Sequence, residues 1–163
     1  MNCIHLGAED YPQLLREIAD PPACLWTRGD RTALSAPGVA IVGARAASQE
    51  GLTAAYDIAF DLARAGIVVI SGLARGVDAV AHAAALDAGG RTVGVLACGL
   101  DTVYPPEHGD LAGRIAGQGA VISEYGLGTR PDAQNFPARN RLISGLALGV
   151  LVVEAAARSG ALI

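Results

Sequence analysis

Short apolar runs alternate with amphipathic helical patterns along most of this chain, and the alternation restricts the fold more than any other feature. Repeated strand–helix units indicate an α/β fold with a doubly wound, mainly parallel sheet in three layers. Crossovers in such a sheet are right-handed. The strands are expected to be buried on both faces, and they are predicted at Val39–Val42, Ile67–Ile70, Thr92–Leu96, Ala120–Ser123 and Leu148–Val153. The spacing of apolar residues predicts helices over about 48–65, 77–88 and 109–116.

The first 37 residues differ from the rest. Proline-containing turns bound a short helix predicted at about 13–18, and a short strand is predicted at Leu25–Thr27. We interpret residues 1–37 as a lead-in segment that packs on the core, and residues 38–163 as a Rossmann-like domain. The strand at Gly38–Val42 is expected near the centre of the sheet. A sixth strand–helix unit would be expected after Ile163, so we expect a C-terminally incomplete domain with one unpaired edge.

Composition supports this fold and restricts the ligand. The 163 residues fit one domain, and with 52% hydrophobic but only 4% aromatic residues the core must be mainly aliphatic. The net charge of −4 argues against a general polyanion binder. All twelve basic residues are arginines, and five of them lie in loops or helix starts that follow predicted strands: Arg45, Arg75, Arg130, Arg139 and Arg141.

The three cysteines, Cys3, Cys24 and Cys98, are widely spaced and form no CxxC pair. This spacing suggests neither a disulfide framework nor a zinc site, so we expect no metal and a reducing, cytoplasmic location. The N-terminus lacks a signal-peptide pattern. The longest apolar runs are strand-sized, so no membrane span is predicted.

The segment from Asn135 to Leu146 carries the strongest functional signal. It places an aromatic ring, two arginines and an asparagine at a predicted helix start, with Pro137 suited to the first turn. Free amides and guanidinium groups form an anion site, and the Phe136 ring offers a stacking surface for a base. The alternative is an ordinary helix start with surface arginines and a core phenylalanine.

Two turns after predicted strands bear on phosphate and cofactor binding. Gly43-Ala44-Arg45 keeps only the first glycine of a dinucleotide fingerprint, and no lysine is present for a P-loop. No cofactor is therefore expected. The turn from Ser71 to Asp78 has glycines whose amides suit a phosphate, with Ser71 as a hydroxyl donor. The alternative is a tight structural turn in which Asp78 favours the helix start.

Catalytic residues are harder to assemble. Glu124 and Glu154 both follow predicted strands and have the chemistry for acid–base work, or they brace Arg45, Arg139 or Arg141. No nucleophile accompanies them, which favours bracing. His82 lies on a predicted helix, where a structural role is more common than a catalytic one. We therefore predict a binding protein and not an enzyme.

Seven motifs in order resemble the DNA-processing protein A (DprA/Smf) family of bacterial natural transformation. They are Tyr11–Leu15 with Asp20–Pro22, Val42–Arg45, Ser71–Ala79, Gly99–Glu107, Ser123–Tyr125, Asn135–Leu146 and Val152–Ala155. Two local differences stand out: Gly126-Leu127-Gly128 replaces the usual Pro-Pro-Gly, and Arg130 is the basic residue nearest upstream of Phe136, where a lysine is common in the family.

The resemblance implies an extended Rossmann-type domain that binds single-stranded DNA and helps to load the RecA recombinase, with a homodimer as a further partner. The implied strand-binding residues are Gly43, Arg45, Ser71, Gly72, Arg75, Phe136, Arg139, Asn140 and Arg141. We expect Arg139 to face the DNA and Arg141 to brace a glutamate, because residues two apart on a helix point in different directions. The alternative function is a nucleotide-processing hydrolase like Rossmann-type phosphoribohydrolases, although their PGGxGT stretch is missing.

Overall fold

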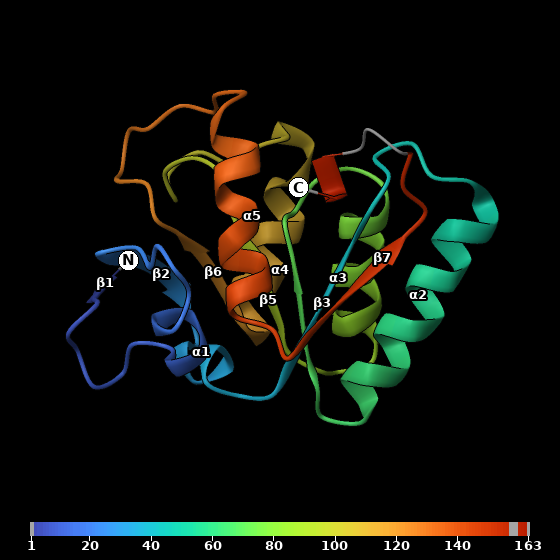
Figure 1. Ribbon diagram of the computed structural model, residues 1–163. Coiled ribbons are helices and arrows are strands. Elements are labelled where there is room, and N and C mark those ends of the chain that lie inside the picture. The colour runs from blue at the N-terminus through green and yellow to red at the C-terminus, as the bar shows by residue number, and fades with distance from the viewer. Residues whose placement is uncertain (1, 157–159, 163) are drawn as a thin grey trace.

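The computed structural model describes residues 2–156 and 160–162. Its centre is a seven-stranded sheet in the order β1-β2-β6-β5-β4-β3-β7 (Figure 1). In the part of the sheet with the order β6-β5-β4-β3-β7, all neighbouring strands run parallel. Strand β2 pairs antiparallel with both β6 and β1. The strands are β1 (Asn2–His5), β2 (Cys24–Gly29), β3 (Gly38–Gly43), β4 (Val68–Ser71), β5 (Thr92–Val95), β6 (Ala120–Ser123) and β7 (Gly149–Val153).

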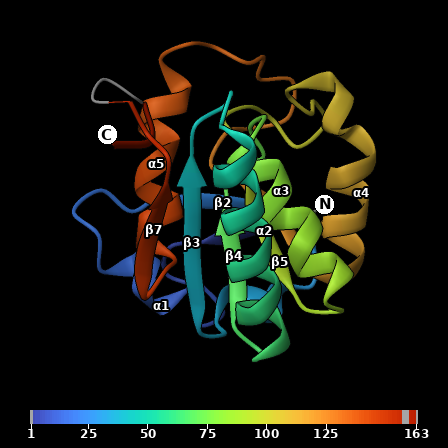
Figure 2. The same cartoon turned by 90° about the vertical axis from the view of Figure 1, so that its right-hand side faces the viewer.

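Helices cover both faces of the sheet, as the alternating pattern predicts. One face carries α2 (Gln49–Arg64), α3 (Val77–Asp87) and α4 (Gly109–Gln118), and the other carries α5 (Asn135–Gly145) with the short α1 (Gln13–Arg16) and the 3-10 turn η1 (Arg31–Leu34) (Figures 1 and 2). Two further 3-10 turns are η2 (Pro106–His108) and η3 (Gly160–Leu162). The three-layer α/β fold is confirmed. In the described part of the chain, no helix combines the length and apolar character needed to cross a membrane.

The apolar strand residues divide between the two helical layers. Along β3, Ile41 packs with the alanine-rich faces of α2 and α3, whereas its neighbour Ala40 packs in the cluster that contains α5. This alternation follows from the period of a strand, in which successive side chains point to opposite faces. The Ser48 hydroxyl accepts a hydrogen bond from the Gly51 amide (3.0 Å), so α2 begins with the expected cap.

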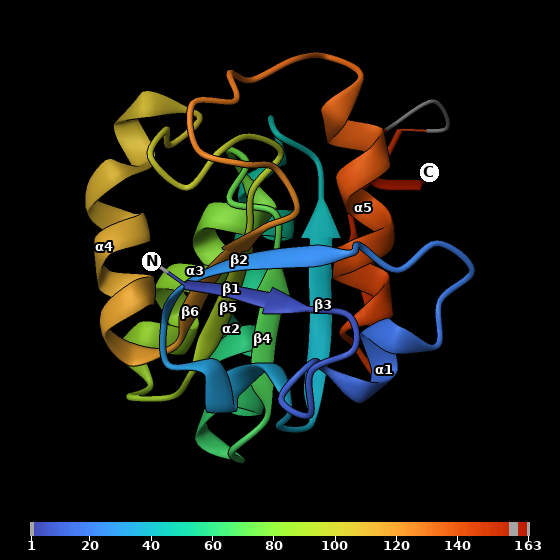
Figure 3. The same ribbon diagram turned by 90° about the vertical axis from the view of Figure 1, so that its left-hand side faces the viewer.

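The N-terminal segment contributes two strands to the sheet. The strand predicted at Leu25–Thr27 is present within β2, which pairs with β6, while β1 was not predicted. In Figure 3, β1 and β2 run across the direction of β3 and β4, so the sheet is strongly twisted at this end. Pairing of β1 with β2 brings together Cys3 and Cys24, which form a disulfide. The sequence analysis did not predict this disulfide, and that interpretation was wrong. The two cysteines are 21 residues apart and meet only through the pairing of β1, which no sequence pattern predicts.

Two strand predictions need correction. The strand at Gly38–Val42 is not central, because β3 lies next to the edge strand β7. The run at Leu148–Val153 is not a buried strand, since Leu148 is 67% and Val150 49% exposed. Successive strands from β3 to β6 add in one direction, and α5 then returns the chain across the sheet so that β7 pairs beside β3. Among the described strands nothing pairs with the outer side of β7, so β7 is an edge strand.

Candidate nucleic-acid interface

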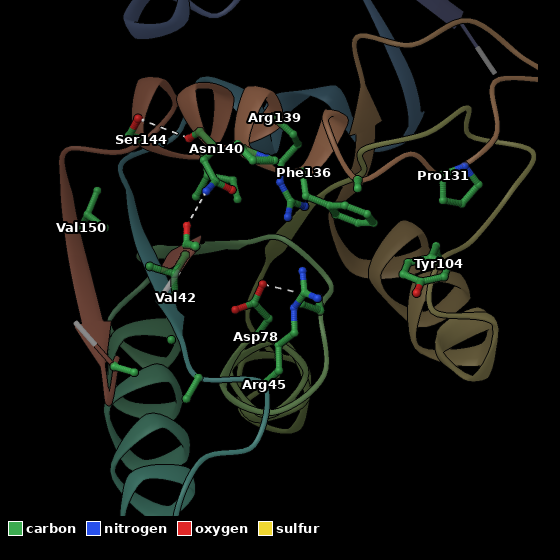
Figure 4. Close-up of a pocket in the computed structure, with 18 of the residues that line it drawn as sticks. Val42, Arg45, Asp78, Tyr104, Pro131, Phe136, Arg139, Asn140, Ser144 and Val150 are labelled. Atoms are coloured by element: carbon green, nitrogen blue, oxygen red, sulfur yellow. Dashed lines mark hydrogen bonds between the residues drawn. The ribbon is translucent and has the colours of Figure 1, made fainter. Parts of the chain in front are cut away.

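The reversal of strand order between β3 and β7 positions a cavity. Helix α2, which follows β3, covers one face of the sheet, and α5, which precedes β7, covers the other. Such a switch point opens a crevice at the carboxyl ends of parallel strands. A cavity of about 950 Å³ lies here, between the loops that follow β3, β4, β5, β6 and β7 and helix α5 (Figure 4). The fold therefore brings distant sequence motifs to one place.

The rim of the cavity combines a cation with aromatic rings. The Arg45 guanidinium carbon lies 5.4 Å from the centroid of the Phe136 ring, which is cation–π distance. The Tyr104 ring is tilted by 51° against Phe136, with centroids 5.5 Å apart. Arg45 is exposed and forms no ion pair with any residue that the structure describes. Positive charge and stacking surface are thus adjacent and accessible.

Helix α5 presents its N-terminus at the same rim. Pro137 lies in its first turn, as predicted, where the missing N–H removes no intrahelical hydrogen bond. The Asn135 amide donates to the carbonyl of Ala97 (3.2 Å), which ties the start of α5 to the segment after β5. No side chain caps this end. The Asn135 backbone amide donates to the carbonyl of Asp132 (3.1 Å) and Pro137 has no N–H, so the backbone amides of Phe136 and Ala138 are the ones that add positive potential here.

Arg139 projects from α5 beneath the rim and is only 5% exposed. Its Nη1 donates to the carbonyl of Gly72 (2.7 Å) and to the carbonyl of Val95, so the side chain joins α5 to the ends of β4 and β5. A Cβ at position 72 would lie 2.6 Å from this guanidinium, which explains the glycine. Burial lowers the pKa of Arg139, and the nearby Asp78 carboxyl opposes that shift.

Asp78, at the start of α3, organises the turn that follows β4. Its carboxylate accepts hydrogen bonds from the amides of Gly72 (3.0 Å) and Ala74 (3.4 Å). Between them Leu73 has a φ of +59°, a left-handed conformation that its complete burial and the two flanking bonds hold in place. Burial raises the pKa of Asp78, and the Arg139 charge is the largest opposing influence. The structural interpretation of this turn is therefore the one realised.

Asp78 and Arg139 belong to a larger set of buried polar residues, here called the buried polar cluster. Its other members are Ser71, His82 and Thr92. The Ser71 hydroxyl donates to the carbonyl of Ile41 (2.6 Å), so it serves the sheet and not a ligand, contrary to the role expected for it. His82 Nδ1 lies 2.7 Å from the Thr92 hydroxyl, and burial lowers the pKa of His82 to about 3.

The structure divides the nine predicted site residues. Those that line the cavity are Gly43, Arg45, Phe136, Arg139 and Asn140. A Cβ at Gly43 would overlap the carbonyl of Val153, so the close approach of β3 and β7 requires this glycine. The amide of Asn140 donates to the carbonyl of Gly160 (2.8 Å). Ser71, Gly72, Arg75 and Arg141 are not part of the cavity lining.

Two of the predicted arginines point to other partners. Arg141 forms a bidentate pair with Glu124 (2.7 and 2.6 Å) and also contacts Asp20, so it joins α5 to β6 and to the N-terminal segment. The hydrogen bond with Glu124 is the main reason that the pKa of Arg141 is raised. Arg75 pairs with Glu107 (2.6 Å) at the surface. The geometry matches the expectation that Arg141 braces a glutamate.

Neither glutamate is arranged for acid–base work. Glu124 is held by Arg141, and Glu154 accepts hydrogen bonds from the Ser48 amide (2.9 and 3.0 Å) and hydroxyl at the start of α2. These bonds lower the pKa of Glu154. Both carboxylates thus fix secondary-structure elements relative to one another.

Sequence reasoning did not identify Tyr104 as a site residue. Its signal was weak: a tyrosine before Pro105-Pro106 in a loop that follows a strand. That loop places Tyr104 in the lining of the cavity, with its ring tilted against Phe136 (Figure 4).

Comparison with known proteins assigns the family. The model of the DNA recombination-mediator protein A family matches residues 2–163. The chain belongs to this family. It is similar to Protein Smf of Synechocystis sp., with 46% identity over 158 residues that make up 94% of this chain and 40% of that protein.

Two solved structures of the family superpose closely. The X-ray structure of DNA processing protein A from Streptococcus pneumoniae has a TM-score of 0.94 and 42% identity, covering 99% of this chain and 56% of that one. A structure of the Helicobacter pylori protein, described by its single-stranded DNA binding mode, has a TM-score of 0.87 and 34% identity, covering 94% of this chain and 70% of that one. The chain spans about half the length of the curated family members that it matches.

Proposed function

We propose that this chain binds single-stranded DNA at the cavity between β3, β7 and α5, as part of DNA processing in natural transformation. The observation that carries the proposal is the placement of the Arg45 guanidinium 5.4 Å from the Phe136 ring at an accessible rim. A guanidinium contacts phosphate and an aromatic face stacks on any base, a combination suited to strand binding without sequence readout.

The arrangement separates contact residues from positioning residues. In this proposal Arg45 contacts a phosphate, Phe136 and Tyr104 stack on bases, and the free amides at the start of α5 approach a second phosphate. Arg139 and Asp78 hold the turn after β4 and the start of α5 in register, because Arg139 Nη1 and the Asp78 carboxylate are engaged by backbone groups. Gly43 and Asn140 shape the cavity wall.

Family membership supports the same ligand. The Helicobacter pylori structure, which shares 34% identity with this chain, is described by its binding of single-stranded DNA. The family is described as a recombination mediator, which supports a further step in which the bound strand is passed to a recombinase such as RecA. We include a homodimer in the proposal because the open edge of β7, with Leu148 and Val150 exposed, favours association.

A binding assay tests the proposal. Fluorescence anisotropy of a labelled oligonucleotide, single-stranded against duplex, is measured over a series of salt concentrations. We expect preference for the single strand and an affinity that falls with salt, because each phosphate contact releases counterions. Equal affinity for the duplex, or an affinity independent of salt, would contradict the proposal.

A matched pair of double variants locates the site. Arg45→Ala/Phe136→Ala should abolish most of the binding, whereas Arg64→Ala/Phe60→Ala, which removes the same side-chain types from α2, should leave it intact. Incubation with nucleoside monophosphates covers the hydrolase alternative: release of free base by the purified chain would favour the enzyme over the binding protein.

A further inference from the structure

Three side chains with metal-ligating atoms gather on one face of the β1–β2 hairpin, away from the cavity. His5 is paired directly with Cys24 in the antiparallel register, and Cys3 lies two residues from His5 on the same strand. Paired residues and residues two apart project from the same face of a sheet. Accordingly the two sulfur atoms and an imidazole nitrogen all lie within 4.8 Å of one another. None of the three residues lines the cavity.

The disulfide describes one redox state of this cluster. A dithiol reductant converts it by thiol–disulfide exchange: the Cys3–Cys24 bond breaks, two thiols form, and the reductant becomes a cyclic disulfide. Reduction leaves two thiols and an imidazole on adjacent strands that are also joined by antiparallel backbone pairing. The hairpin then offers two sulfur ligands and one nitrogen ligand.

We propose that the reduced hairpin binds one Zn²⁺ ion through Cys3, His5 and Cys24. Exchange with a small-molecule disulfide, which takes up the two electrons and leaves as two thiols, restores the Cys3–Cys24 bond and releases the ion. Thiolate and imidazole are the ligands that Zn²⁺ prefers, with bonds of about 2.3 Å to sulfur and about 2.0 Å to nitrogen. Two atoms held tetrahedrally at such distances are roughly 3.5–4 Å apart, and the three ligand atoms of the hairpin all lie within 4.8 Å of one another. The cysteines are half-buried and His5 is exposed, so an ion reaches the site from solvent, which supplies the fourth ligand.

The His5 imidazole favours a metal site over a disulfide that serves only to stabilise the fold. A disulfide needs two cysteines only, whereas His5 adds a third ligand at the register position opposite Cys24. The hairpin also contains its own reporter. Trp26, the single tryptophan of the chain, is paired with Cys3 and therefore lies on the same face.

Co²⁺ is the spectroscopic probe for the test, and Zn²⁺ is the competitor. The full chain is titrated with Co²⁺ after reduction and, in parallel, as the disulfide form. We expect the reduced chain to bind one equivalent, with sulfur-to-cobalt absorption and quenching of Trp26 fluorescence, both reversed by Zn²⁺. The disulfide form should show neither signal, because a disulfide has no thiolate to donate. Equal binding by both forms, or no binding by the reduced form, would overturn the proposal.

Variants identify the ligands. His5→Ala changes an exposed side chain, so it should leave the fold intact and weaken Co²⁺ binding by roughly tenfold or more, equivalent to about 1.4 kcal/mol. Cys3→Ser should abolish the sulfur-to-cobalt absorption. Cys98→Ala removes the buried free thiol and is the control that should bind as the unmodified chain does. Unchanged affinity in His5→Ala, or loss of binding in Cys98→Ala, would refute the three-residue site.

Discussion

The buried polar cluster and the rim of the cavity use the same kinds of side chain under opposite conditions. Arg139, in the cluster, is 5% exposed and donates to two backbone carbonyls, whereas Arg45, at the rim, is exposed and lies against the Phe136 ring. A buried polar group without a partner in the protein is costly, because water is not available to it, and Arg139 Nη1 has two such partners. An exposed one can exchange water for a ligand. Burial therefore distinguishes arginines that position the site from those that can contact DNA.

The largest expected effect is on the cluster. Arg139→Met keeps much of the side-chain volume but leaves the carbonyls of Gly72 and Val95 without their donor. We expect a loss of about 3 kcal/mol in the free energy of unfolding, since each unsatisfied buried group costs roughly 1–3 kcal/mol. Urea denaturation measures it, with Arg64→Met on the exposed face of α2 as the control. If Arg139→Met unfolds like the unmodified chain yet loses DNA binding, Arg139 belongs with the rim instead.

The second effect depends on pH. The pKa of His82 is about 3 in the folded protein, because of burial, against 6.5 for an unperturbed histidine. Between these two pKa values the unfolded chain binds a proton that the folded chain does not bind. The contribution of neutral His82 to the free energy of unfolding is therefore fully present above pH 6.5 and is lost progressively as the pH falls toward 3. The free energy of unfolding lost by pH 5 is roughly 2 kcal/mol, at about 1.4 kcal/mol per pH unit below 6.5.

Denaturation curves of His82→Asn and the unmodified chain between pH 7 and pH 4.5 isolate this contribution. The variant should lose less stability than the unmodified chain as the pH falls. His5→Asn removes an exposed histidine and should follow the unmodified chain. Identical slopes for His82→Asn and the unmodified chain would show that His82 is protonated without cost, and so is not part of a dry cluster.

The third effect is on the rim. Phe136→Ala should reduce the affinity for single-stranded DNA by roughly 1–3 kcal/mol, the usual value of one base stacked on an aromatic ring. Affinity and melting temperature are measured on the same sample, and Phe60→Ala, which removes the other phenylalanine, is the control. Phe60 stacks on Tyr56 on α2, away from the cavity lining. A destabilised Phe136→Ala with undiminished affinity per folded molecule would place Phe136 in the core and defeat the stacking proposal.

The same contrast explains how far the sequence could be interpreted. Periodicity predicts the helices and parallel strands well, because α2, α3 and β6 follow local patterns of apolar residues and caps. Strand order is not local. The place of β3 beside the edge, and the exposure of β7, depend on where α5 returns the chain, which no apolar run encodes.

The candidate site shows a similar limit. Glycines and arginines after strands indicate its position, since parallel strands end at one edge of the sheet. Whether an arginine contacts the ligand or holds protein groups in place depends on its partners in the fold. Arg141 meets Glu124 and Asp20, the latter 121 positions away in the sequence, and Arg139 meets backbone carbonyls, which a sequence pattern does not identify. Tyr104 joins the rim through the fold of its loop, and Cys3 meets Cys24 through an unpredicted strand.

The smallest expected effect is also the most specific test of the comparison. Arg45→Ala removes one exposed charge that has no ion-pair partner in the described chain, so the fold should keep its stability. If Arg45 contacts one phosphate, the slope of log affinity against log salt should become shallower by about 0.7, the value for one contact on single-stranded DNA. Arg64→Ala lowers the net charge equally from an exposed position on α2, so it separates a specific contact from a general change in charge. A shallower slope in Arg45→Ala alone assigns the contact to the rim. The same decrease in both variants would mean that charge acts over the whole surface. An unchanged slope in Arg45→Ala would remove Arg45 from the site and leave only the aromatic part of the rim to bind a strand.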